Sequence, residues 1–395
     1  MAPDTSCISP FARPLYVMLK PAGAACNLGC TYCYYLEKKK LYPEVETPVM
    51  SEEVLEKFTE QYLCAQTMDQ VLFTWHGGET LLRNKNFYLK ALELQKKYGG
   101  RRQIDNVIQT NGTLLTDDWC RFFKEHHFLV GVSVDGPGHC HDVYRKTKQG
   151  RPSFSGVMKG ITLLKKYGVA FNVMGAINDY NVDYPLEFYH FFKQMDCRYI
   201  QFAPVVELMD GKLAPWCVPS EKWGDFLIAI FDEWVKQDVG TCYVQYFDAT
   251  LANWAGEKPG ICTLGRTCGH AGVMEFNGDV YACDHFVFPE YKIGNISAET
   301  LTEMMYSDRQ VNFGRQKYTA LPGRCKACDF LFACYGECPK NRILETETGE
   351  KGLNYLCKGY HKFFKHVAPY MDFMSNELAN GRPPANVMEA LRRGL

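Results

Sequence analysis

The chain has 395 residues, of which 46% are hydrophobic, and this is enough to build one large domain together with a smaller one. Its formal net charge of −1 gives no basic excess of the kind that binds nucleic acid or an anionic membrane surface. The apolar runs are too short to span a bilayer, and the first residues lack the basic and apolar segments of a secretory signal. We therefore expect a soluble, cytoplasmic protein with no nucleic acid and no membrane among its partners.

Strand-like and helix-like segments alternate between residues 16 and 206. This alternation predicts a parallel sheet with right-handed crossovers. Six such units are two fewer than a closed eight-stranded barrel contains, so we expect an α/β fold with a partial (β/α)6 barrel. The predicted strands are Tyr16–Lys20, Val71–Trp75, Asn106–Gln109, Leu129–Ser133, Phe171–Ala176 and Tyr199–Phe202, and the predicted helices cover residues 51–66, 86–98, 116–126, 153–167 and 185–195.

Short motifs follow the ends of the first four predicted strands. A single glycine turn is usually only a turn. Because the chemistry of such barrels gathers at the carboxyl ends of the strands, four motifs on successive units predict one functional rim. The first strand leads into a cysteine-rich loop, and the next three lead into His76-Gly77-Gly78-Glu79, Thr110-Asn111-Gly112 and Ser133-Val134-Asp135-Gly136-Pro137.

A linker and a bridging amphipathic helix are predicted for residues 207–257. The apolar side chains of this helix recur at helical spacing, and Ser220 is its expected N-cap. We expect the barrel to cover residues 1–206 and a cysteine-rich domain to cover residues 258–375. Residues 376–395 are expected to form a polar C-terminal tail that frays.

Three cysteines follow the first predicted strand with the spacing Cys26-x₃-Cys30-x₂-Cys33. Thiolates are soft ligands that suit iron–sulfur clusters, which usually take four of them. Three cysteines therefore leave one iron of a 4Fe–4S cluster without a protein ligand. A zinc site that lacks one ligand is the alternative.

Eight further cysteines lie between residues 262 and 357, enough for two sites of four thiolates each. On spacing alone, two structural zinc ions and two iron–sulfur clusters fit this set equally well. The other seven cysteines are scattered, and we expect them to be small buried side chains without a ligand role. The clustered eight are Cys262, Cys268, Cys283, Cys325, Cys328, Cys334, Cys338 and Cys357, and the scattered seven are Cys7, Cys64, Cys120, Cys140, Cys197, Cys217 and Cys242.

Both cysteine patterns resemble those of known families. The first motif is typical of radical SAM enzymes, in which the open iron binds S-adenosylmethionine (SAM). The later spacing, with Gly278 ahead of Cys283, resembles the SPASM extension, which holds two auxiliary 4Fe–4S clusters. The chain as a whole resembles anaerobic sulfatase-maturating enzymes in the stretches Leu15-Tyr-Val-Met-Leu-Lys-Pro, Phe73-Thr-Trp-His-Gly-Gly-Glu-Thr, Gln109-Thr-Asn-Gly-Thr-Leu, Val132-Ser-Val-Asp-Gly-Pro, Gly278-Asp-Val-Tyr-Ala-Cys-Asp-His-Phe and Leu353-Asn-Tyr-Leu-Cys.

This resemblance implies a reaction and its partners. The family oxidises a serine or cysteine in a Cys/Ser-x-Pro-x-Arg motif of a sulfatase to Cα-formylglycine without oxygen. The implied partners are an unfolded or nascent sulfatase polypeptide and a low-potential electron donor such as flavodoxin or ferredoxin. The implied cofactors are SAM and three 4Fe–4S clusters, one that binds SAM and two auxiliary clusters that carry an electron away.

The resemblance also implies a role for individual residues. Asp284 would be the catalytic base, with His285 as a weaker candidate, and Tyr35 would lie near the substrate peptide. Thr80 departs from the family pattern, which has proline there, so the loop is expected to be less rigid. SAM would contact Tyr32, Gly78, Glu79, Ser133, Arg145 and Val206. Cys26, Cys30 and Cys33 would hold the first cluster, Cys262, Cys268, Cys283 and Cys338 auxiliary cluster I, and Cys325, Cys328, Cys334 and Cys357 auxiliary cluster II.

Two other functions are open to the sequence. One is a SPASM-type maturase that forms crosslinks in a ribosomal peptide, which would leave no aldehyde in its product. The other is an iron–sulfur electron carrier or regulator without SAM chemistry. A carrier gains nothing from an open iron, so the three-cysteine motif disfavours it.

Overall fold

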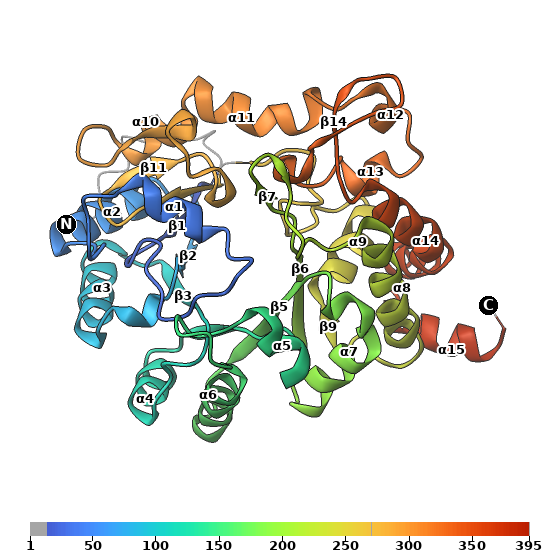
Figure 1. Ribbon diagram of the computed structural model, residues 1–395, viewed down its shortest axis with the longest axis horizontal. Coiled ribbons are helices and arrows are strands. Elements are labelled where there is room, and N and C mark those ends of the chain that lie inside the picture. Colours follow the sequence, from blue (N-terminus) through green and yellow to red (C-terminus); the bar gives the residue numbers. More distant parts are fainter. Residues whose placement is uncertain (1–13, 270, 395) are drawn as a thin grey trace. The chain divides into compact units, whose positions relative to one another are not determined.

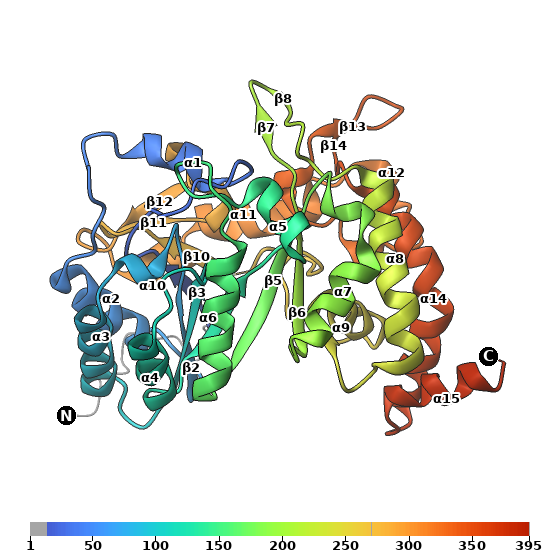
Figure 2. The ribbon, with the colours of Figure 1, turned by 60° about the horizontal axis from the view of Figure 1, so that its bottom comes forward.

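The computed structural model describes residues 14–269 and 271–394, and the chain divides into two compact units (Figures 1 and 2). Each unit is assembled from segments that lie far apart in the sequence. The first takes Met1–Val132, Tyr144–Phe171 and Gly269–Gly314, and the second takes Ser133–Val143, Asn172–Cys268 and Arg315–Leu395.

The first unit is built on a mixed sheet. Its strands run in the order β12-β11-β10-β1-β2-β3-β4, parallel from β10 to β4, with β11 and β12 added as antiparallel neighbours of β10. Strand β10 comes from the region that the sequence assigned to the cysteine-rich domain, yet it pairs with β1. The strands are β1 (Tyr16–Leu19), β2 (Gln70–Trp75), β3 (Gln103–Thr110), β4 (Leu129–Ser133), β10 (Ala271–Met274), β11 (Asp279–Tyr281) and β12 (Lys292–Asn295).

Several helices of the first unit begin at side-chain caps and bury aromatic side chains. Ser51 and Asn84 each accept a hydrogen bond from a backbone N–H in the first turn of the helix that follows. Phe73 of β2 is fully buried and packs edge-on against Phe58 and Tyr62. Burial of each such ring contributes about 1.5–3 kcal/mol. The helices are α1 (Tyr35–Lys38), α2 (Glu52–Cys64), α3 (Lys85–Tyr98), α4 (Asp117–Glu125), α6 (Phe154–Tyr167) and α10 (Leu301–Tyr306).

In the second unit a small parallel sheet, β5-β6-β9, is accompanied by helices. Helices α8 and α14 pack closely because Gly224 and Gly359 face each other, and a Cβ on Gly359 would lie 2.0 Å from the carbonyl oxygen of Ser220. The elements are β5 (Phe171–Ile177), β6 (Tyr199–Pro204), β9 (Tyr243–Val244), the hairpins β7–β8 (Leu208–Met209, Lys212–Leu213) and β13–β14 (Leu344–Glu345, Lys351–Leu353), and the helices α7 (Pro185–Gln194), α8 (Ser220–Gln237), α9 (Gln245–Trp254), α12 (Gly323–Lys326), α13 (Leu331–Cys334), α14 (Cys357–Ala379) and α15 (Val387–Arg392). Helices α5 (Gly138–Tyr144) and α11 (Asp308–Thr319) have residues in both units.

Two expectations about the C-terminal half were wrong. Pro219, not Ser220, is the N-cap of α8, and the Ser220 hydroxyl instead accepts a hydrogen bond from the Gly359 N–H at 3.3 Å. The tail is also more ordered than predicted, because Val387 is fully buried and Arg382 donates to the Glu377 carboxylate at 2.9 Å. No helix in the described part of the chain combines the length and the apolar character that crossing a membrane requires.

Candidate active site

The loop with Cys26, Cys30 and Cys33 follows β1 in the first unit. The N–H of Cys33 donates to the carbonyl oxygen of Cys30 at 3.1 Å, which closes a turn between the last two cysteines. The Gly29 N–H donates to the Lys146 carbonyl at 2.8 Å, so the loop is also held by a segment distant in the sequence. Burial, with smaller contributions from the charges of Glu79 and Cys33, raises the pKa of the Cys26 thiol. The three thiols are thus presented by a backbone that is hydrogen-bonded at several points.

The Gly77-Gly78-Glu79 segment after β2 lies directly against this cysteine loop. The Gly78 N–H donates to the Gly23 carbonyl and the Glu79 N–H to the Ala25 carbonyl, each at 2.8 Å. A Cβ on Gly78 would lie 2.1 Å from the Ala25 carbonyl oxygen, and Gly77 has a φ of +121°. Only glycine permits this approach of the two backbones.

The Glu79 carboxylate is buried and joins the segments that follow β2 and β3 by hydrogen bonds. One oxygen accepts from the Leu81 N–H at 2.9 Å and from the Thr110 hydroxyl at 2.8 Å, and the other accepts from the Asn111 N–H at 2.8 Å. Burial raises its pKa, although these hydrogen bonds oppose the shift. The Thr80 hydroxyl donates to the Gln109 carbonyl at 2.8 Å and so also ties the segment after β2 to β3.

A buried network of charges and hydroxyls surrounds Asp284, which follows Cys283. Lys20 Nζ lies 2.6 Å from Asp284 Oδ1, and Lys38 Nζ lies 3.9 Å from the same oxygen. The Tyr34 and Tyr35 hydroxyls lie 2.5 Å and 2.8 Å from Asp284 Oδ2. Burial would raise the pKa of Asp284, but the two lysines hold it well below its ordinary value, so the carboxylate is ionised.

The network continues from Tyr35 to His76. The Tyr35 hydroxyl lies 2.9 Å from His76 Nδ1, and the same nitrogen accepts from the Gly77 N–H at 2.8 Å. Burial lowers the pKa of His76, which favours the neutral form of the ring. Burial and the Asp284 charge raise the pKa of Tyr35 well above its ordinary value, so its hydroxyl is a donor.

The predicted SAM contacts divide between the two units. Tyr32, Gly78, Glu79 and Arg145 belong to the first unit, where the Arg145 guanidinium lies 5.6 Å from the centre of the Tyr32 ring. Ser133 and Val206 belong to the second, where the carbonyl oxygen of Val206 accepts from Lys340 Nζ at 2.8 Å.

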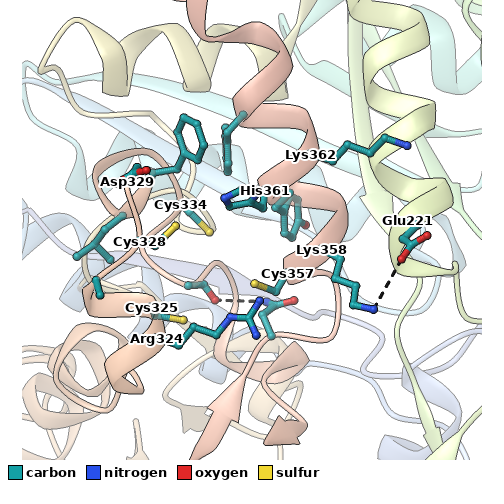
Figure 3. Close-up of a pocket in the computed structure, with 17 residues that line it drawn as sticks. Glu221, Arg324, Cys325, Cys328, Asp329, Cys334, Cys357, Lys358, His361 and Lys362 are labelled. Carbon is teal, nitrogen blue, oxygen red and sulfur yellow. Dashed lines mark hydrogen bonds and ion pairs between the residues drawn. The ribbon is translucent and has the colours of Figure 1, made fainter. Parts of the chain in front are cut away.

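Four of the later cysteines line one cavity of about 660 Å³ in the second unit (Figure 3). Cys325, Cys328 and Cys334 come from the α12–α13 segment, and Cys357 is the first residue of the 23-residue helix α14. The positive end of this long helix favours an anionic group in the cavity. Among the described residues no three His, Cys, Asp or Glu side chains are placed to share a single metal ion. Four thiols around one space are the donor set of a 4Fe–4S cluster.

The remaining cysteines form two groups, the other four of the clustered eight and the scattered seven. Cys262, Cys268 and Cys338 belong to the second unit and Cys283 to the first. Of the scattered seven, Cys7 lies outside the described residues, and Cys64 is half-buried. The other five, Cys120, Cys140, Cys197, Cys217 and Cys242, are buried free thiols as expected.

Sequence reasoning missed the groups that hold Asp284. Lys20, Lys38 and Glu275 were given no role, and His76 was noted only as part of a glycine motif. Lys20 is fully buried and Lys38 is 3% exposed, which is rare for lysine and implies charged partners. The signal for Lys20 was its place at the carboxyl end of an apolar strand, but the sequence did not reveal its partner.

Comparison with known proteins shows which families the chain resembles. The radical SAM superfamily model matches residues 21–192, and an iron–sulfur cluster-binding domain matches residues 268–329. The chain is 63% identical over 402 residues to the serine-type anaerobic sulfatase-maturating enzyme of Bacteroides thetaiotaomicron, with 98% of this chain and 97% of that protein covered. It is 31% identical over 371 residues to the cysteine-type enzyme of Clostridium perfringens, with 92% and 99% covered.

A solved structure also matches the chain. That of anSMEcpe with bound AdoMet and the Cp18Cys peptide matches with a TM-score of 0.83 and 31% identity, over 92% of this chain and 100% of that chain. The expected fold, a partial (β/α)6 radical SAM barrel with a C-terminal SPASM domain, is confirmed, and the iron–sulfur interpretation of the later cysteines prevails over zinc. The chain belongs to the family of anaerobic sulfatase-maturating enzymes.

Proposed function

We propose that this protein converts a serine in the Cys/Ser-x-Pro-x-Arg motif of a sulfatase into Cα-formylglycine without oxygen, with Asp284 as the base. Membership of its family makes it a SAM-dependent radical enzyme of sulfatase maturation that acts on a peptide. The proposal is carried by the ionised carboxylate that follows Cys283, that of Asp284, whose side chain is 14% exposed and held by buried lysines. An ionised carboxylate can accept the proton that a serine hydroxyl loses on the way to an aldehyde.

The chain's residues fit the cofactors of this chemistry. SAM and the 4Fe–4S clusters, when bound, supply hydrogen-atom abstraction and a path for the released electron. We assign the first cluster to Cys26, Cys30 and Cys33. Auxiliary cluster I is assigned to Cys262, Cys268, Cys283 and Cys338, and auxiliary cluster II to Cys325, Cys328, Cys334 and Cys357.

SAM is assigned to the rim of the first unit. The backbone of Gly78 and Glu79 offers acceptors for an ammonium group, and Arg145 offers a guanidinium for a carboxylate. Tyr32, Ser133 and Val206 complete the assignment. Because the Glu79 carboxylate already accepts three hydrogen bonds, its main contribution is to hold the Gly77-Gly78-Glu79 segment in place.

The low pKa of Asp284 sets the order of events. Oxidation of serine removes one hydrogen atom from Cβ, one proton from Oγ and one electron. A weakly basic carboxylate takes up the hydroxyl proton most readily after Cβ has lost its hydrogen atom, because that loss makes the hydroxyl more acidic. The Tyr34 and Tyr35 hydroxyls now donate to Asp284 Oδ2, so the substrate hydroxyl would replace one of them.

Serine is preferred over cysteine in this proposal because the serine-type relative is 63% identical and the cysteine-type relative 31%. The electron donor would be a low-potential carrier such as flavodoxin or ferredoxin, and the client an unfolded or nascent sulfatase. Such a reaction requires a reducing environment, which the cytoplasm provides.

The test is anaerobic reconstitution with SAM, a reductant and two peptides that differ only in Ser or Cys at the target position. We expect a hydrazine-reactive aldehyde from the Ser peptide, with a mass loss of about 2 Da. A peptide with Ala at the target position is the control. Aldehyde from neither peptide would overturn the proposal, and a crosslink without aldehyde would favour the alternative maturase reaction.

A further inference from the structure

The three residues between Cys334 and Cys338 all have left-handed backbone conformations, which are rare for two of them, Tyr335 and Glu337. Tyr335, Gly336 and Glu337 all have positive φ, at 45°, 69° and 50°. For Tyr335 and Glu337 this costs about 1–2 kcal/mol each. Such a run persists only where the surroundings determine it. In the ligand assignment proposed above, Cys334 and Cys338 serve different auxiliary clusters, so this segment joins the two sites.

Arg342 holds the segment in this shape. Its guanidinium donates to the carbonyl oxygens of Gly336 at 3.0 Å and Tyr335 at 2.8 Å, and more weakly to that of Glu337 at 3.2 Å. Gly336 has a φ of +69°, the left-handed region that favours glycine, and a Cβ there would lie 2.9 Å from Arg342 Nη2. Guanidinium stays charged in proteins. A permanent positive charge is therefore built into the connection between the two cysteine sets.

Lys317 places a second positive charge beside one of these sets. It lies on α11, is 1% exposed, and its ammonium donates to the carbonyl oxygens of Cys262 and, at 2.7 Å, Thr263. The hydrogen bond to the Cys262 carbonyl places this ammonium next to one of the cysteines assigned to auxiliary cluster I.

Arg342 acts on both sets. Its guanidinium donates to the carbonyl oxygen of Tyr335, which follows Cys334, and to that of Glu337, which precedes Cys338. Cys338 is assigned to auxiliary cluster I and Cys334 to auxiliary cluster II.

Glu337 provides a charge of the opposite sign. Its side chain is buried, and its Oε2 accepts from Asn354 Nδ2 at 3.0 Å and from Asn341 Nδ2 at 3.2 Å. The Glu337 N–H donates to the Cys334 carbonyl at 2.8 Å, and the residue directly precedes Cys338. The carboxylate therefore lies close to proposed ligands of both auxiliary clusters and disfavours further negative charge there.

We propose that Lys317, Arg342 and Glu337 form a buried charge triad that sets the reduction potentials of the auxiliary clusters, a role that rests on the ligand assignment proposed above. A buried positive charge favours the reduced, more negative form of a cluster, and a buried carboxylate disfavours it. Lys317 and Arg342 raise the potentials and Glu337 lowers them. Lys317 tunes auxiliary cluster I, whereas Arg342 tunes both. The triad thereby sets the reduction potential at which the auxiliary clusters accept the electron released by the substrate.

The test uses two nearly isosteric variants with opposite changes in charge, Lys317→Met and Glu337→Gln. Both are made in a chain with Cys26→Ala, Cys30→Ala and Cys33→Ala, so that only the auxiliary clusters give signals. Iron content is measured first, and we expect about eight irons per chain for two 4Fe–4S clusters. The midpoint potentials are then determined by redox titration followed by electron paramagnetic resonance.

We expect Lys317→Met to shift the midpoint potential of an auxiliary cluster to a more negative value. Glu337→Gln should shift the midpoint potential of an auxiliary cluster to a more positive value. Each variant should change the ratio of reduced to oxidised cluster at a fixed potential about tenfold, or about 59 mV for a one-electron couple. Unchanged potentials, or shifts of the same sign, at full iron content would overturn the triad. Iron content well below about eight in the parent chain would instead overturn the ligand assignment. The opposite signs distinguish tuning from damage to the fold.

Discussion

Lys20 Nζ lies 2.9 Å from Glu275 Oε1 because the preceding residues, Leu19 and Met274, are register partners in the parallel strands β1 and β10. The Lys20 N–H continues this pairing by donating to the Met274 carbonyl at 2.9 Å. The same ammonium lies 2.6 Å from Asp284 Oδ1, so one fully buried lysine serves two carboxylates. The register of two strands thereby places the counter-charge of the proposed base.

Replacement of Lys20 by Met should destabilise the protein strongly. It leaves the carboxylates of Glu275, which is buried, and Asp284 without their shared cation, and loss of one partner of a buried pair costs about 3–5 kcal/mol. Thermal unfolding of the reconstituted protein measures the effect. The double variant Lys20→Met/Glu275→Gln is the control and should recover part of the loss, since it removes one of the two uncompensated charges. Equal melting temperatures for wild type and Lys20→Met would contradict the role of this ion pair.

Gly78→Ala should impair the first cluster site specifically. The added Cβ would lie 2.1 Å from the Ala25 carbonyl oxygen, so the cysteine loop must move away from the rim. We expect iron content to fall by up to four irons per chain, the number in one cluster, while the auxiliary clusters remain. Gly100→Ala is the control, because a Cβ there meets nothing within 4 Å, while its φ of +63° adds a backbone strain that Gly78→Ala lacks. Equal iron content in both variants would argue against the close packing.

Aldehyde formation should depend on the charge of Lys38. Burial lowers the pKa of Lys38 to about 8, against the opposing charge of Asp284. The ammonium is therefore charged below about pH 8 and neutral above it, and it donates to the Asp284 carbonyl when charged. We expect product formation to fall as the pH rises through about 8. Lys38→Arg keeps its charge and should lose this descending limb. Identical pH profiles for the two proteins would exclude Lys38 as the titrating group.

Much of the barrel could be predicted because its signals are local. Leu129–Ser133 was predicted to the residue, since a β-branched apolar run leads directly into a glycine-proline turn. The helix predicted over residues 51–66 is α2, which begins one residue later because Ser51 caps it and accepts a hydrogen bond from a first-turn N–H. By contrast, Ser220 was misjudged as a cap because its hydroxyl binds a helix more than a hundred residues away in the sequence.

The site was predictable only in part, because several of its contacts join residues that are distant in the sequence. Spacing identified the cysteines, and the family resemblance suggested Asp284. Lys20 and Glu275 meet through strand pairing between residues 255 positions apart, which no local pattern reveals. The same holds for Lys317, whose partners lie in the Cys262-Thr263 backbone.

The central claim is that Asp284 takes the substrate proton, and Asp284→Asn tests it most directly. The amide is nearly isosteric but is a poor base, so the two half-reactions should separate. With the Ser peptide, SAM and a reductant, we expect 5′-deoxyadenosine at a rate near that of the wild type and aldehyde reduced by about 10²-fold or more. Iron content equal to that of the wild type shows that the clusters are intact. Aldehyde at the wild-type rate would contradict the account.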